Sequence, residues 1–163
     1  MTWRPIRLPL AVICGALAGC GDSKKPPPEA PPPPPPVLEL KVTGSADQNP
    51  GADKTPGPVS IHLYDLAGTE KFGKADVFAL IDHEQATLGA DDLGATDFVL
   101  KPSETQTLKQ DLKPGTQYIG VLALFYDIDN ARWRASAAVQ AHGVTRLVLT
   151  VDKLSVSLKP AGP

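Results

Sequence analysis

Cys20 is the residue of this sequence with the clearest chemistry. Residues 17–20 read Leu-Ala-Gly-Cys, and they end an apolar stretch (6–18) that has Arg4 and Arg7 near its start. A positive segment, a short apolar segment and small residues before the cleavage position are typical of a secretory signal. Cleavage directly before a cysteine is typical of a lipoprotein. We therefore expect Cys20 to carry a diacylglycerol on its thiol and an acyl group on its new N-terminus.

The alternative for this segment, a retained membrane-spanning helix, is disfavoured by its length. A spanning helix needs about 20 apolar residues, and this stretch is shorter, with Pro5 and Pro9 near its start. Each acyl methylene buried in the bilayer strengthens membrane binding by about 0.8 kcal/mol, and two or more chains give stable anchoring. In the enterobacterial sorting rule, an aspartate directly after the cysteine retains a lipoprotein on the inner membrane. Here Gly21 takes that position, and Asp22 comes one place later. We expect an outer-membrane anchor with the folded domain in the periplasm.

The remaining residues with potential chemistry do not form a catalytic or metal-binding pattern. His62, His83 and His142 are far apart, without an HExxH spacing or a second thiol in the mature chain. The sequence has no GxSxG, P-loop or GxGxxG motif. The run 127–130 (Asp-Ile-Asp-Asn) resembles the start of a calcium loop, but Ala131 takes a ligand position, so a turn rich in Asx residues is the better interpretation. We predict no enzyme activity, no metal and no cofactor beyond the lipid.

The charge and the cysteine content limit which functions and which sources of stability are open to the mature chain. Loss of the signal with its two arginines would leave 14 Lys and Arg against 18 Asp and Glu, a formal net charge of −4. Nucleic-acid binding needs a basic footprint, so we exclude it. Cys14 would leave with the signal, and no disulfide could form within the mature chain. Stability must then come from one apolar core, which a domain of this length can supply.

Three regions follow along the chain: a signal peptide (1–19), an acylated cysteine with a proline-rich tether (20–36), and one domain (37–163). The tether reads GDSKKPPPEAPPPPPP after the cysteine. Proline favours polyproline II, which would extend on the order of 50 Å at about 3.1 Å per residue. The tether is therefore predicted to hold the domain away from the membrane. A ligand for a PxxP-binding module is the alternative, but such modules are not expected in the periplasm.

The domain is predicted to be all-β. Short segments carry apolar residues at alternate positions, which is typical of strands with one buried face. These positions are Leu38, Leu40 and Val42; Val59, Ile61 and Leu63; Phe98 and Leu100; Leu108 and Leu112; 118–125; Trp133, Ala135, Ala137 and Val139; Leu147, Leu149 and Val151; Leu154, Val156 and Leu158. Segment 118–125 is apolar on both faces and is predicted at the centre of a sheet. About eight strands predict a β-sandwich.

Two segments depart from the strand pattern. Residues 75–81 have apolar residues at helical spacing and predict a short helix, and 88–93 is a candidate for a second short helical turn. The segment 44–58 is rich in proline and glycine and is longer than a hairpin turn needs. Long loops on a rigid scaffold tend to carry function, so this loop is the candidate functional element.

Three stretches of the domain resemble the TssJ family (also VasD or SciN), the outer-membrane lipoproteins of the type VI secretion system. They are NPGADKTPGPVSIHLYDL (49–66), FGKADVFALIDHEQATLGADDL (72–93) and LKPGTQYIGVLALFYDIDNARWR (112–134). Their Pro-x-Pro-Val and Leu-Gly-x-Asp elements resemble the family pattern, and the Asp-x-x-x-Ala-x-Trp-Arg element of the third stretch matches it in order and spacing. The chain departs from the family at Lys54 and Thr55, where Gly-Arg is common, and at His62 and Tyr126, where arginine is frequent.

The resemblance implies a transthyretin-like β-sandwich of about eight strands with a short helical insertion and no enzymatic activity. It implies binding to the periplasmic C-terminal domain of TssM, an indirect link to TssL within the trans-envelope complex, and a role in fastening that complex to the outer membrane. The family's principal TssM contact is the loop between the first two strands. Its residues here are Ala46, Asp47, Gln48, Asn49, Pro50, Gly51, Ala52, Asp53, Lys54, Thr55, Pro56, Gly57 and Pro58.

Two other functions stay open on this sequence. A periplasmic transthyretin-like lipoprotein that binds a ligand or hydrolyses a substrate, as hydroxyisourate hydrolases do, would need clustered histidine and arginine and a distinctive C-terminal tail. The histidines here are scattered, and the chain ends Leu-Lys-Pro-Ala-Gly-Pro. A purely structural envelope lipoprotein is the other alternative.

Overall fold

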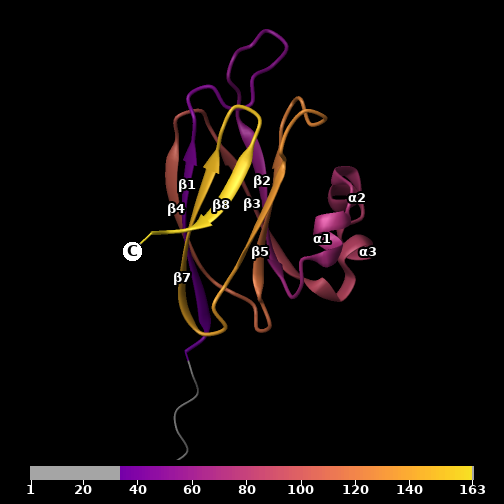
Figure 1. Cartoon of the computed structure of the whole chain (residues 1–163), viewed down its shortest axis with the longest axis vertical. Coiled ribbons are helices and arrows are strands. Elements are labelled where there is room, and N and C mark those ends of the chain that lie inside the picture. The colour runs from indigo at the N-terminus through magenta and orange to yellow at the C-terminus, as the bar shows by residue number, and fades with distance from the viewer. Residues whose placement is uncertain (1–33, 163) are drawn as a thin grey trace, which may run out of the picture. The chain divides into compact units, whose positions relative to one another are not determined.

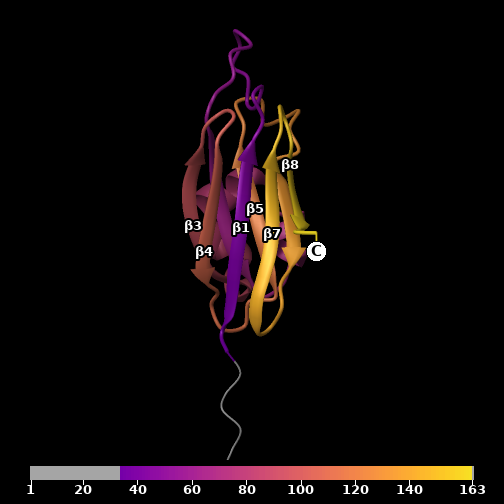
Figure 2. The same cartoon turned by 90° about the vertical axis from the view of Figure 1, so that its left-hand side faces the viewer.

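The computed structural model describes residues 34–162, and the signal segment, Cys20 and most of the tether lie outside this range. Eight strands form two four-stranded sheets (Figures 1 and 2). In spatial order, one sheet contains β4 (Thr105–Asp111), β1 (Pro36–Gly44), β7 (Gly143–Val151) and β8 (Val156–Pro160). The other contains β3 (Asp92–Leu100), β2 (Val59–Leu66), β5 (Tyr118–Leu124) and β6 (Arg134–Ala138). The predicted all-β sandwich is confirmed.

The core between the sheets follows the predicted alternation. Leu38, Leu40 and Val42 of β1 are fully buried, and they belong to one cluster with Ile61 and Leu63 of β2. Full burial of such a side chain stabilises the fold by about 1.5–3 kcal/mol. The polar residues between these positions face outward, so the period of two in the sequence determines which face of each strand is buried.

β1 is an interior strand that runs through the domain from one end to the other. It pairs in parallel with β7 over nine positions, from Pro36 opposite Gly143 to Gly44 opposite Val151. On its other side it pairs antiparallel with β4. The chain therefore enters at Pro36, at the end of the sandwich opposite to that where it leaves β1 at Gly44 (Figure 1).

The helical insertion lies between β2 and β3 on the outer face of the second sheet (Figure 1). It contains α1 (Glu70–Lys74), α2 (Val77–Asp82), α3 (Glu84–Leu88) and the 3-10 turn η1 (Gly89–Asp91). α2 confirms the helix predicted over 75–81. The second helical turn, predicted over 88–93, corresponds to α3 and η1, which together begin at Glu84. They end at Asp91, because β3 starts at Asp92. α1 was not predicted, because Phe72 is its only buried residue and a single apolar position defines no helical period.

A second core joins these helices to the sheet. Phe72 of α1 packs over Gly120, where a Cβ would come within 3.1 Å of the phenyl ring and 2.7 Å of the Leu66 side chain. Leu122 of β5 faces the same cluster, so β5 is buried on both faces, as its sequence predicted. Arg134 of β6 donates from Nη1 to the carbonyls of Phe72 and Ala75 at 3.0 and 2.8 Å. The end of α1 is thus fixed to the sheet by packing and by hydrogen bonds.

None of the helices within residues 34–162 is long and apolar enough to cross a membrane.

Candidate functional site

The loop that joins β1 to β2 projects beyond the ends of the strands (Figure 1). Its 13 predicted binding residues (46–58) are continuous in the chain, and the structure divides them into two parts. Gln48, Asn49 and Gly57 form a buried base, whereas residues 52–56 form an exposed tip. The base positions the loop, and the tip is accessible to a partner.

Gln48 fastens the base of the loop to the last residue of β3. Its Nε2 donates to the carbonyl of Leu100 at 2.9 Å and to that of Gly57 at 3.3 Å. Space for this side chain depends on Gly44, because a Cβ there would come within 2.2 Å of Gln48 Oε1 and 2.9 Å of the Lys101 carbonyl oxygen. The glycine that ends β1 therefore allows the loop to turn tightly over the sandwich.

Asn49 links the loop to two other segments. Its backbone N–H donates to the carbonyl of Lys153 at 2.9 Å, and its Oδ1 accepts from the backbone N–H of Tyr126 at 2.7 Å. Its Nδ2 donates to the carbonyl of Pro58. The backbone of Asn49 has φ of 45°, a region that asparagine tolerates better than most residues. A buried amide with all of these partners holds one defined loop conformation.

The tip is a closed turn. Gly51 N–H donates to the Thr55 carbonyl, and Lys54 N–H donates to the Gly51 carbonyl, each at 2.9 Å. Asp53 accepts from the backbone N–H and the hydroxyl of Thr55 at 3.0 and 2.8 Å. The backbone hydrogen bond from Thr55, followed by the hydroxyl bond, lowers the pKa of the Asp53 carboxyl. These local bonds order the tip before any partner binds, which reduces the entropy lost on association.

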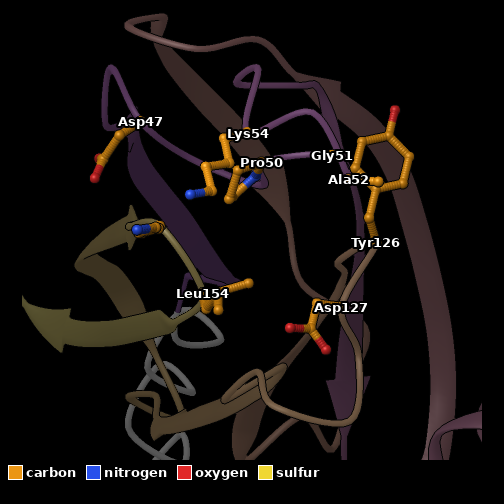
Figure 3. A pocket seen from close by; sticks show the side chains of 9 residues that line it. Asp47, Pro50, Gly51, Ala52, Lys54, Tyr126, Asp127 and Leu154 are labelled. Atoms are coloured by element: carbon orange, nitrogen blue, oxygen red, sulfur yellow. The ribbon is translucent and has the colours of Figure 1, made fainter.

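An open groove of about 900 Å³ lies beside the loop (Figure 3). Its lining comes from three segments: the loop, the start of the turn after β5, and the turn between β7 and β8. The lining residues are Asp47, Pro50, Gly51, Ala52, Lys54, Tyr126, Asp127, Lys153 and Leu154. The four that lie outside the loop were not predicted as site residues. They are separated by 72 to 107 positions from the loop residues that line the groove, and local sequence carries no signal of that proximity.

The residues considered for chemistry in the sequence stay apart in the structure. His62 lies on β2 and pairs with Asp97 of β3 at 2.7 Å, whereas His83 and His142 are exposed in other segments. Among residues 34–162, no group of three His, Cys, Asp or Glu residues could hold a metal ion. Residues 126–130 form a turn in which Asn130 Nδ2 donates to both carboxylate oxygens of Asp127, at 2.9 and 3.1 Å. The interpretation of this run as a turn is confirmed.

The fold and the loop define a class: an eight-stranded β-sandwich with a helical insertion that presents an ordered loop at one end. A family model described as "Type VI secretion lipoprotein, VasD, EvfM, TssJ" matches residues 36–157. The chain therefore belongs to the type VI secretion lipoprotein (TssJ) family, as the sequence motifs predicted.

Solved structures agree with this assignment. The T6SS lipoprotein TssJ1 from Pseudomonas aeruginosa has a TM-score of 0.76 and 29% identity, with 80% of this chain and 99% of that chain covered. Serratia marcescens Lip, a membrane-bound component of the type VI secretion system, has a TM-score of 0.70 and 23% identity, with 79% and 98% covered. A chain in a structure described as the T6SS protein TssM C-terminal domain from EAEC has a TM-score of 0.63 and 22% identity, with 77% and 98% covered. No match was found among the curated proteins.

Proposed function

We propose that this chain is anchored in the outer membrane through lipid on Cys20 and binds the periplasmic C-terminal domain of TssM through the loop 46–58. It would act without catalysis, as a fastener between the outer membrane and the type VI secretion membrane complex. The family assignment supports the secretion role. The similarity to a chain from a structure of the TssM C-terminal domain supports the choice of partner.

The observation that carries this proposal is the placement of the two attachment points. The tether leads into Pro36 at the start of β1, and the loop leaves Gly44 at its end. Nine residues of extended strand span about 30 Å, so a lipid at one end and a partner at the other are held apart by the height of the sandwich. A loop that reaches beyond the strands, at the end of β1 opposite to Pro36, is well placed to contact a protein that approaches from the periplasm (Figure 1).

The proposed contact with TssM is tested by measuring the affinity for the cognate TssM periplasmic domain by calorimetry. Ala52→Arg places a bulky charge on the exposed tip and leaves Gln48 and Asn49 untouched, so we expect an intact fold and binding weakened more than tenfold. Ala86→Arg places the same side chain on the exposed surface of α3 and is the matched control. Unchanged affinity for Ala52→Arg would exclude the tip as the contact.

The anchor arm uses Cys20→Ser. We expect this variant to fold and to bind the isolated TssM domain with wild-type affinity, but to be absent from the outer-membrane fraction and to fail in assembly of the complex. Membrane fractionation and co-purification measure these two properties. Normal secretion by the variant would refute the role of the lipid.

A further inference from the structure

The groove beside the loop contains unused hydrogen-bond donors. It is lined by two carboxylates, Asp47 and Asp127, and two ammonium groups, Lys54 and Lys153. Both carboxylates already accept hydrogen bonds from their own segments: Asp47 from the Ser45 hydroxyl at 2.8 Å, and Asp127 from the Asn130 amide. Neither lysine forms an ion pair with any residue in the range 34–162. The groove therefore offers a partner free cationic donors.

The two lysines come from separate segments that the fold holds together. Lys54 lies on the loop tip, whereas Lys153 lies in the turn between β7 and β8, where its carbonyl accepts from the backbone N–H of Asn49 at 2.9 Å. The groove is therefore formed in the free protein and does not need to assemble when a ligand arrives. Preformed sites lose less entropy on binding.

Apolar surface lies beside these charges. Tyr126 is 66% exposed, although its backbone N–H is held by Asn49. The ring lies directly on the backbone of Gly57, where a Cβ would come within 2.8 Å of Cε2. Leu154 and Pro50 line the groove between the charged groups (Figure 3). An exposed aromatic ring on a fixed backbone is the kind of residue that dominates binding energy at protein interfaces.

We propose that this groove receives an acidic segment of the partner. A carboxylate of that segment would lie between Lys54 and Lys153, and an adjacent apolar side chain would pack on Tyr126 and Leu154. This inference rests on the proposed function, because the segment is assigned to the TssM periplasmic domain. It extends the contact from the loop to two neighbouring turns, which include residues more than 70 positions away in the chain.

The test uses charge reversal at the lysine outside the loop. Lys153→Glu should weaken binding of the TssM periplasmic domain at least tenfold at low salt, because the partner carboxylate then faces a like charge. The loss of affinity caused by Lys153→Glu should become smaller at high salt, where exposed charges are screened. Lys101→Glu makes the same change in the turn between β3 and β4, at the same end of the sandwich but outside the groove, and should stay within twofold of wild type.

The aromatic part is tested with Tyr126→Ala and Tyr126→Phe. Tyr126→Ala keeps the backbone N–H that Asn49 binds, so we expect a folded domain and at least tenfold weaker binding. Tyr126→Phe keeps the ring and should bind like wild type. Circular dichroism and thermal melting verify the fold of each variant.

The outcomes separate this inference from the proposed function. Wild-type binding that Ala52→Arg abolishes, with Lys153→Glu and Tyr126→Ala both within twofold of wild type, would overturn the groove and leave the loop as the contact. Absence of wild-type binding would overturn the proposed partner and the groove together. Tenfold losses at both groove residues, with the Lys101 variant unaffected, would support the groove.

Discussion

Asn49 Oδ1 accepts a hydrogen bond from the backbone N–H of Tyr126 at 2.7 Å, which joins two loops that are 77 residues apart in the chain. The same asparagine donates to the Pro58 carbonyl and, through its backbone N–H, to the Lys153 carbonyl. One buried residue, through its side chain and its backbone N–H, therefore sets the relative positions of three loops at the end of the sandwich where the candidate binding surface lies. The function of Asn49 is structural, although it belongs to the predicted contact loop.

Asn49→Ala is predicted to destabilise the domain by about 2–4 kcal/mol. The substitution removes two partly buried side-chain hydrogen bonds and leaves the Tyr126 N–H and the Pro58 carbonyl without these partners. It also places alanine at a positive φ. Equilibrium unfolding in urea measures the change.

Asn130→Ala is the matched control, because it removes an exposed amide that bonds only to Asp127. We expect its free energy of unfolding to stay within about 0.5 kcal/mol of wild type. If the urea midpoints of the two variants coincide, the central role of Asn49 in the loop architecture is wrong.

Sequence patterns were sufficient for the sandwich and for the location of the loop, but not for its internal organisation. Alternating apolar residues predicted the buried face of β1, because successive side chains of a strand point to opposite faces of the sheet. Gln48 and Asn49 look like ordinary polar loop residues, yet they are 0% and 1% exposed. Their hydrogen-bond partners include Leu100 and Tyr126, and no local pattern encodes a contact over such separations. The groove was missed for the same reason.

Glu84→Gln is predicted to stabilise the domain at neutral pH and to have no such effect in acid. Burial, followed by the charge of Asp92, raises the pKa of the Glu84 carboxyl above its usual value, with a further contribution from Asp97 and an opposing one from His62. A carboxyl with a raised folded-state pKa weakens the fold progressively as the pH rises from its unfolded-state value, 4.5, to the raised value, because the unfolded chain loses the proton first. The penalty is absent well below pH 4.5, where the carboxyl is protonated in both states, and is complete above the raised pKa.

The measurement is the difference in Tm between Glu84→Gln and wild type as the pH rises from 4 to 8. We expect the difference to start near zero and to become positive by a few degrees as the pH passes the raised pKa. Asp82→Asn removes an exposed carboxylate at the end of the neighbouring helix α2 and is the matched control. A flat profile for the Glu84 variant would show that its carboxyl does not strain the attachment of α3 to the sheet.

Force applied between the tether and the loop is predicted to leave the sandwich folded. These attachment points lie at the two ends of β1, and the load between them passes along one strand that is already extended. An extended strand at about 3.3 Å per residue can lengthen little before the limit of about 3.6 Å. The core and the pairing with β7 therefore need not break when the lipid and the partner pull against each other.

Single-molecule pulling with cysteine handles at Pro35 and Ala52, in a chain without Cys14 and Cys20, should give only a short extension of at most a few tens of Å. Handles at Pro35 and Gly162 in the same background should instead unfold the whole domain, with a gain of roughly 400 Å. Because only 17 residues separate the first pair of handles, their distance cannot exceed about 60 Å, and the force of the step is therefore the deciding measurement. A step with the first pair at a force similar to that which unfolds the domain with the second pair would show that β1 does not carry the load alone.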